Sequence, residues 1–297
     1  MVAPALLEIW VAESGVVMGK TVVLEELLQG ELIERVHASE FTRRRFIQDF
    51  FMRSKPLIIE GATADWKASS WTLDNVSQYI PDQSVSVRNK PDGVLFDANS
   101  MAHEAVDIPL HQYLHLLRSG KNETPMYLAQ TNLAGLLSNP EIYAPRFKYL
   151  RRADYLLQTN IWIGTPGLAT PCHYDFAHNF YHQICGHKHI TLFSPEDSAR
   201  LYPNPKIPAI SLVDVASPDA EKFPDFKNTR PLQFVVGPGD SVFIPAGWWH
   251  YVASTYDNNI SINQWYLRLW SRNTHQLKMI PPMIAHGIKH LLASRKR

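Results

Sequence analysis

The stretch TPCHYDFAHNFYHQICGHKHITLFSP, residues 170–195, holds three short runs of strand-forming residues, namely PCHYD, NFYHQIC and HKHITLF. Further short runs lie on both sides, from LLQTNIWIG at 156–164 to NISINQWYL at 259–267. Short strands in such close succession are typical of an antiparallel barrel or sandwich, whereas a parallel sheet needs long crossovers between its strands. The sequence therefore predicts a mainly β fold.

Helical patterns precede this β region. Residues 21–53 carry apolar residues at helical spacing, which predicts two helices, the second capped by Ser39. Another short helix is expected at 72–79, capped by its first residue, and a longer one begins at Pro109 and stops at Gly120. Apolar or alternating runs predict additional strands at 55–61, 84–89 and 125–133.

A last helix is expected near the C-terminus, because its apolar residues fall on one face: Met283, Ile284, Ile288, Leu291 and Leu292. Such a face covers either the barrel or a second copy of the chain, so a homodimer through this helix is one expectation. We divide the chain into an N-terminal extension (1–124), a barrel core (125–270) and a C-terminal helix (271–297). The helices at both ends are expected to wrap the barrel.

Composition limits the partners and the compartment. The 297 residues carry a formal net charge of +1, so the overall charge favours neither a nucleic-acid nor a membrane partner. Two cysteines are too few for a disulfide scaffold, and no apolar run reaches the length of a membrane span. The start of the chain lacks the basic region of a secretory signal. We therefore expect an intracellular protein, cytoplasmic, nuclear or both.

The opening stretch also suggests a metal site. His173 and Asp175 are separated by one residue, and side chains at that spacing point to the same face of a strand. His250, which follows the turn-rich segment GPGDSVFIPAGWW, is the best candidate for a third ligand. Two histidines and one carboxylate leave three positions open on an octahedral ion, the arrangement that non-haem Fe(II) oxygenases require.

Other histidines and both cysteines compete for this role. The chain has 13 histidines, so a His-x-Asp triplet alone is weak evidence. A closed zinc site would need a fourth strong ligand, and Cys172 is expected on the face opposite to His173. We expect a structural role for the neighbouring histidines, which are His178, His182, His187 and His189.

Several ordered motifs resemble one protein family. The run TPCHYDFAHNFYHQICGHKHITLFSPEDSARLYP, followed by VDVASPDAEKFPDF, VVGPGDSVFIPAGWWHYV and ISINQWY, is similar to the small JmjC (cupin-like) oxygenases that depend on Fe(II) and 2-oxoglutarate. The similar branch contains the asparaginyl hydroxylase of hypoxia-inducible factor and the JmjC arginyl hydroxylases. The resemblance covers roughly residues 125–268 and implies a double-stranded β-helix (jelly-roll or cupin barrel) with iron inside its mouth.

The resemblance implies roles for individual residues. His173, Asp175 and His250 match the iron ligands of the family. Lys188 matches the lysine that pairs with the distal carboxylate of 2-oxoglutarate, which agrees with the cost of burying an unpaired ammonium in a barrel. Tyr127 matches a hydroxyl donor to the same carboxylate.

Four further positions match the co-substrate pocket. Thr170 corresponds to a second hydroxyl donor, Asn179 and Asn263 to amides near the chelating end, and Trp265 to an aromatic wall. From the residues alone, Thr170 could equally be a turn residue before Pro171, and Tyr127 a core aromatic.

The implied activity is that of a 2-oxoglutarate-dependent dioxygenase. With Fe(II) as cofactor and 2-oxoglutarate and O₂ as co-substrates, it would hydroxylate an unactivated C–H of a protein or peptide side chain and release succinate and CO₂. Ala129 stands where the asparaginyl hydroxylase has a glutamine, which weakens an asparagine assignment. Alternatives are the same reaction on RNA or a small metabolite, and a non-catalytic metal-binding cupin. Demethylation ranks lower, because no methyl-lysine cage is recognisable.

Overall fold

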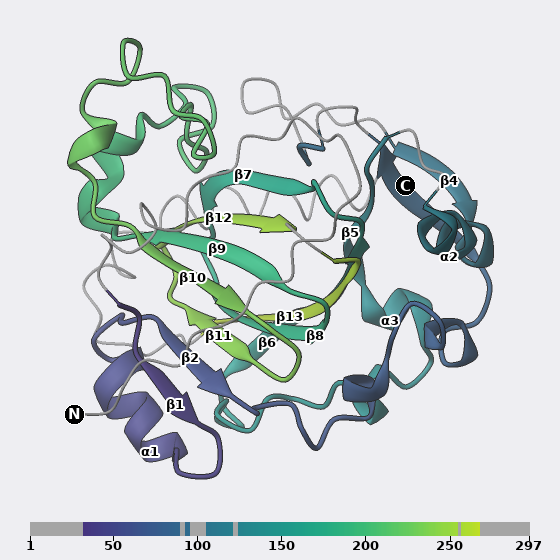
Figure 1. The fold of residues 1–297 in the computed structure, drawn as a ribbon. Helices are drawn as coiled ribbons and strands as arrows, with labels where there is room; N and C mark the ends of the chain where they lie inside the picture. Colours follow the sequence, from purple (N-terminus) through teal and green to yellow (C-terminus); the bar gives the residue numbers. More distant parts are fainter. Residues whose placement is uncertain (1–31, 90–92, 96–104, 121–123, 255–256, 268–297) are drawn as a thin grey trace, which may run out of the picture.

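Two facing β-sheets dominate the computed structural model, which describes residues 32–89, 93–95, 105–120, 124–254 and 257–267 (Figure 1). The larger sheet has nine strands in the order β1-β2-β11-β8-β13-β6-β5-β3-β4. The smaller sheet has four strands in the order β10-β9-β12-β7. The expected mainly β fold is therefore confirmed.

Eight strands form the barrel, four from each sheet, and their neighbours in the sheets are antiparallel. From β6 to β13 the chain crosses between the two sheets at every step except from β9 to β10, which are neighbours in the smaller sheet, so that β6, β8, β11 and β13 face β7, β9, β10 and β12. This is the double-stranded β-helix that the family resemblance implied. The eight strands are β6 (Tyr155–Gly164), β7 (Ala169–Tyr174), β8 (His178–Cys185), β9 (Lys188–Phe193), β10 (Leu232–Val236), β11 (Ser241–Ile244), β12 (Trp249–Ser254) and β13 (Asn259–Leu267).

Five further strands extend the larger sheet on both edges. They include all three additional strands that the sequence predicts, and they lie on both sides of the expected boundary at residue 124/125. That boundary, like the one at 270/271, stays a prediction. The five strands are β1 (Arg35–His37), β2 (Leu57–Glu60), β3 (Ser84–Asn89), β4 (Ala105–Pro109) and β5 (Met126–Asn132).

The helices are short, and two expectations about them are wrong. Helix α2 (Leu110–Ser119) follows Pro109 and ends at Gly120, whose φ of 60° suits glycine, as predicted. Helix α1 (Arg43–Arg45), continued by a π-helical segment at Phe46–Phe51, is capped by Thr42 instead of Ser39. Residues 35–37 form a strand that pairs with β2, so the helix can begin only after the chain has left the sheet.

The helix expected at 72–79 is reduced to one 3₁₀ turn, Val76–Gln78. The Asn75 side chain accepts a hydrogen bond from the backbone of Thr72 and donates one to the carbonyl of Ser70, and such local bonds compete with helix formation. One further α-helix, α3 (Leu133–Leu136), completes the α-helices in the described ranges. Short 3₁₀ helices lie at Lys67–Ser70, Pro140–Ile142, Pro195–Leu201 and Phe226–Asn228.

The expected C-terminal helix at 271–297, its homodimer contact and the first part of the helical region at 21–53 lie outside the described residues. None of the helices in the described ranges has the length and apolar character that a bilayer crossing requires.

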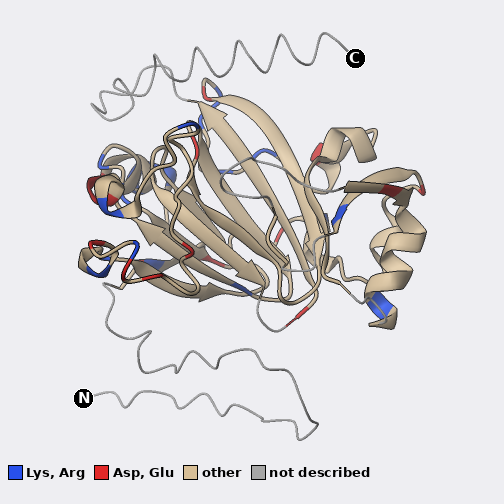
Figure 2. Ribbon diagram, turned by 90° about the horizontal axis from the view of Figure 1, so that it is seen from above, with Lys and Arg blue, Asp and Glu red and all other residues tan. Residues whose placement is uncertain are grey.

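The larger sheet separates two hydrophobic cores at strand β8. In β8, Phe180 and Ile184 face an outer core that also contains Phe46, Trp66 and other side chains from the segments wrapped around the sheet. Tyr181 faces the barrel interior. Most charged positions lie in loops and helices around the barrel, so a charge on an inward-facing strand position is unusual (Figure 2).

His182 lies in the outer core as a neutral imidazole. Its Nδ1 lies 2.6 Å from the Ser241 hydroxyl, and its ring packs 4.5 Å from Phe147 and 4.6 Å from Trp66 between ring centroids. Burial lowers the pKa of His182 to about 3. This histidine is therefore a structural residue, as the sequence predicted.

We expect His182 to make the protein acid-sensitive. Below pH 6.5 the unfolded chain binds a proton at this position and the folded chain does not until about pH 3, so stability is lost as the pH falls through that window. The loss is at most about 1.4 kcal/mol per pH unit. We measure the free energy of unfolding with denaturant at pH 7, 6, 5 and 4. This free energy should change less steeply with pH in His182→Leu than in the wild type. An equal dependence of the unfolding free energy on pH in both proteins would contradict a neutral His182. His187→Gln serves as the control at a surface histidine.

Candidate metal centre

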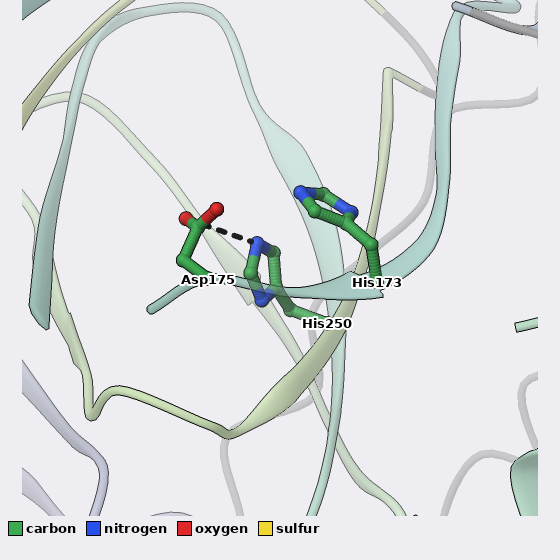
Figure 3. Close-up of side chains that lie close together, drawn as sticks. All are labelled: His173, Asp175 and His250. Atoms are coloured by element: carbon green, nitrogen blue, oxygen red, sulfur yellow. Dashed lines mark ion pairs between the residues drawn. The ribbon is translucent and has the colours of Figure 1, made fainter. Parts of the chain in front are cut away.

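Three side chains converge at one end of the barrel: His173 on β7, Asp175 just after it and His250 on β12 (Figure 3). One ligand atom from each lies within 4.8 Å of the others. His173 and His250 are directly opposite each other in the antiparallel ladder, so both imidazoles face the same side. The strand ends at Tyr174, one residue earlier than expected, and the Gly247 N–H holds the Asp175 carbonyl at 2.9 Å.

Backbone carbonyls fix the orientation of both imidazoles. Nδ1 of His173 lies 2.8 Å from the carbonyl oxygen of Pro171, and Nδ1 of His250 lies 3.1 Å from that of Trp248. A carbonyl only accepts, so each Nδ1 carries the proton and each Nε2 carries a lone pair. This is the arrangement in which metal-binding histidines are usually held. The Nε2 of His250 lies 3.8 Å from Oδ2 of Asp175.

The electrostatics of the three residues fit a cation. Burial raises the pKa of Asp175, while His173 and the nearby Trp265 indole lower it. Burial and the charge of His173 hold the pKa of His250 well below its usual value, which keeps this imidazole neutral. Among the described residues, Oδ2 of Asp175 is buried without a hydrogen-bond partner, which is costly for a carboxylate. A divalent metal bound by the three side chains would offset that cost.

The Trp265 indole lies beside the Asp175 carboxylate without a regular hydrogen bond. It is close enough to lower the pKa of the acid, yet within the described structure its Nε1 has no partner that meets hydrogen-bond geometry. We regard the contact as a weak polar one, because the geometry of a hydrogen bond is a stricter criterion than electrostatic proximity. Trp265 on β13 thus lies beside one of the three potential metal ligands, and its role in binding a co-substrate stays a prediction.

A β-bulge in the β7–β12 pair brings Thr170 to the same side as His173. The register shifts between His250 and Val252, so that His173 pairs with His250 and Thr170 pairs with Val252. Residues three apart in a regular strand face opposite sides, whereas an extra residue in a bulge reverses the alternation. The bulge therefore places two predicted site residues on the same side of the sheet.

Lys188 is a buried cation on the inner face of β9, with 1% of its surface exposed. Its Nζ lies 2.5 Å from the Ser254 hydroxyl, 3.3 Å from the Tyr127 hydroxyl and 5.0 Å from the centre of the Tyr127 ring. No carboxylate among the described residues lies within ion-pair distance of Nζ, and burial lowers the pKa of Lys188 to about 7. Such an ammonium favours an anionic ligand.

The ladder separates this cation from the three potential ligands. Lys188 is opposite Ser254, and Leu192 is opposite His250. The step of four residues from Lys188 to Leu192 corresponds to roughly 13 Å along the strand. The long side chain of Lys188 makes the distance from its Nζ to the potential ligands shorter than this backbone separation. The structure therefore places a cation and a potential metal site at two ends of one inward-facing surface.

The two predicted amides contact each other. Asn263 on β13 donates from Nδ2 to Oδ1 of Asn179 on β8 at 3.2 Å, and its own Oδ1 accepts from Nε1 of Trp162 at 2.8 Å. Trp162 and Ser254 were not identified from the sequence. The only signal for Ser254 was its position four residues after His250, on the same face of the strand.

The four neighbouring histidines stay outside this centre. In the described ranges, the only group of at least three histidine, cysteine or acidic side chains that is close enough to hold a metal is His173, Asp175 and His250. Instead, His178 accepts from the backbone of Ala246, and His187 pairs with Asp257.

Comparison with known proteins gives one matching family model, described as a cupin-like domain, over residues 43–270. The lysine-specific demethylase 8 of Danio rerio is 30% identical over 79% of this chain and 58% of its own. The HSPB1-associated protein 1 of Rattus norvegicus is 28% identical over 82% of this chain and 54% of its own. The JmjC domain-containing protein D of Dictyostelium discoideum is 28% identical over 75% of this chain and 54% of its own.

The chain spans about half the length of these curated relatives. The family model nevertheless covers most of the chain, including all eight barrel strands and all three potential metal ligands. The chain therefore belongs to the cupin-like JmjC family, within the superfamily of Fe(II)- and 2-oxoglutarate-dependent oxygenases.

Proposed function

We propose that this chain is a 2-oxoglutarate-dependent dioxygenase that hydroxylates an unactivated C–H of a protein or peptide side chain. The observation that carries the proposal is the pairing of two features on one inner surface. One is a His–Asp–His group with a buried, unpartnered carboxylate oxygen, and the other is a buried lysine without a carboxylate partner in the described chain. Together they suit a metal and a dicarboxylate.

His173, Asp175 and His250 would hold Fe(II). Their donor set of two imidazole nitrogens and one carboxylate oxygen suits this ion and leaves open positions. The carbonyls of Pro171 and Trp248 keep both Nε2 atoms available as ligands.

The remaining predicted residues would bind 2-oxoglutarate. The ammonium of Lys188 pairs with the distal carboxylate, and Tyr127 and Thr170 contribute hydroxyl groups beside it. Burial keeps the Tyr127 hydroxyl protonated by raising its pKa, so it can donate. The amides of Asn179 and Asn263, which contact each other, would lie near the chelating end of the co-substrate, and Trp265 would wall the site on the side of Asp175.

When bound, Fe(II) with 2-oxoglutarate and O₂ supplies an oxidation that inserts one oxygen atom into a C–H bond and yields succinate and CO₂. The chain itself binds the reactants, excludes water and orients the substrate carbon. Part of the substrate wall would come from the insert between β9 and β10, whose Ile210 bridges to His173 and whose Ile207 packs with Tyr127 and Trp162.

The relatives' names raise demethylation as a second candidate, since one relative is named a lysine-specific demethylase. Hydroxylation of an N-methyl carbon also ends in loss of the methyl group, so one active centre can support either outcome. A protein substrate agrees with both. RNA or a small metabolite as substrate, and a non-catalytic metal-binding protein, are the remaining alternatives.

We expect Asp175→Ala to lose the metal. Removing the only carboxylate of the ligand set should weaken Mn(II) binding, used as the redox-stable probe, by more than about 100-fold. Isothermal calorimetry of the full chain measures this. Asp257→Ala, which removes an exposed carboxylate paired with His187, is the matched control and should bind as the wild type does. Equal affinities in the two variants would remove Asp175 from the ligand set.

We expect turnover to add one oxygen atom to a peptide. A peptide array incubated with Fe(II), 2-oxoglutarate and O₂ should yield peptides heavier by one oxygen, with one succinate formed per product, and none with Asp175→Ala. Mass spectrometry distinguishes the outcomes. Loss of a methyl group would mean demethylation, and oxygen incorporation only in RNA or metabolite pools would contradict a peptide substrate.

We expect 2-oxoglutarate binding to take up a proton. The pKa of Lys188 is lowered to about 7 without an anionic partner, and a bound carboxylate raises it. Above pH 7 the free site is therefore partly deprotonated, and affinity should fall by up to about tenfold per pH unit. Calorimetry at pH 8 in phosphate and Tris buffers measures the uptake. No uptake, or the same uptake in Lys188→Met, would contradict this assignment.

A further inference from the structure

Ser254 is the group closest to the buried ammonium of Lys188, and the sequence assigned it no role. It is the last residue of β12, stands directly opposite Lys188 in the β9–β12 ladder and is 2% exposed. Its Oγ lies 2.5 Å from Nζ of Lys188. Because directly opposed residues face the same side of a sheet, both side chains point into the barrel.

Counting hydrogen-bond donors defines what this pair can bind. An ammonium has three N–H donors and no acceptor. Two of those donors are directed at Ser254 Oγ and at the Tyr127 hydroxyl, which leaves one for a ligand. A hydroxyl that accepts from an ammonium keeps its own proton free to donate elsewhere. Lys188 and Ser254 therefore present two adjacent donors, which match the two oxygens of one carboxylate.

The backbone of Ser254 holds this hydroxyl in place. Its N–H donates to the carbonyl of Leu168 and its carbonyl accepts from the N–H of Gly167, each at 2.8 Å. These bonds fix the end of β12 to the turn before β7, in addition to the ladder with β9. A donor held this rigidly loses little conformational entropy when a ligand binds.

We propose that Ser254 is a further co-substrate-binding residue, which donates its hydroxyl proton to the distal carboxylate of 2-oxoglutarate while it accepts a hydrogen bond from Lys188. The inference rests on the proposed function, because it concerns the same co-substrate. It adds a specific claim: recognition of the second carboxylate depends on a serine of β12 as well as on the lysine of β9.

Two keto acids test the claim. 2-Oxopentanoate has the same chain as 2-oxoglutarate but ends in a methyl group, so it can reach the metal without engaging the lysine end. Binding of each acid to the Mn(II)-loaded full chain is measured by calorimetry. Ser254→Ala should lower the affinity for 2-oxoglutarate by about tenfold to hundredfold, as expected when a charge-assisted hydrogen bond is lost. The affinity for 2-oxopentanoate should change by less than about twofold.

Two more variants control for folding. Ser241→Ala removes another buried strand hydroxyl, on the outer face beside His182, and should leave both affinities unchanged. Ser254→Cys nearly preserves the volume but offers only a weak donor, so it should lose 2-oxoglutarate selectivity even if Ser254→Ala does not fold. Thermal unfolding of each metal-free variant verifies the fold.

The outcomes separate the two proposals. Wild-type affinity for 2-oxoglutarate in both Ser254 variants would overturn the role of Ser254 and leave the proposed function intact. An equal loss for both keto acids would assign Ser254 to the scaffold and also overturn its role. If the metal-loaded wild type binds neither acid, the proposed function fails as well.

Discussion

The antiparallel pairing of β7 with β12 is the interaction on which the candidate site depends. Its register sets His173 opposite His250, and its bulge turns Thr170 to the same side. Because the backbone ladder positions both imidazoles before any metal binds, the site is pre-organised by the sheet and not by its ligand. The carbonyls that orient the two imidazoles come from Pro171 within β7 and from Trp248 directly before β12, so the backbone of the same strand pair also sets the orientation of both rings.

Burial of opposite charges gives the inner surface its chemistry. Asp175 carries an unpartnered carboxylate oxygen near the mouth, and Lys188 is buried farther along the barrel without a carboxylate partner in the described residues. Each arrangement is costly in an isolated fold, and each would be relieved by a ligand of the opposite charge. The larger sheet buries apolar side chains on its outer face, as with Phe180 and Ile262, and this burial provides the stability that such costs require.

Local pattern reasoning succeeded where neighbouring residues decide the structure. Alternation predicted the strand around Val85, a short apolar run predicted the strand around Ile58, and the proline and glycine at its ends predicted helix α2. The predicted helix cap at Ser39 was wrong, because residues 35–37 pair with β2, which lies about twenty residues further along the chain. Pattern reasoning also failed at Thr72, where the Asn75 side chain bonds to nearby backbone instead of allowing a helix.

The sequence by itself determined the strand-rich fold, the His-x-Asp pair and, through motif resemblance, the residues of the site. Periodicity and residue chemistry carry that information, because both act over a few positions. Tertiary structure alone decided that His250 stands opposite His173, that a bulge brings Thr170 to the same side, and that Ser254 contacts Lys188 and Trp162 contacts Asn263. Those outcomes depend on the register between strands, which cooperative packing of the whole sheet sets and no single segment encodes.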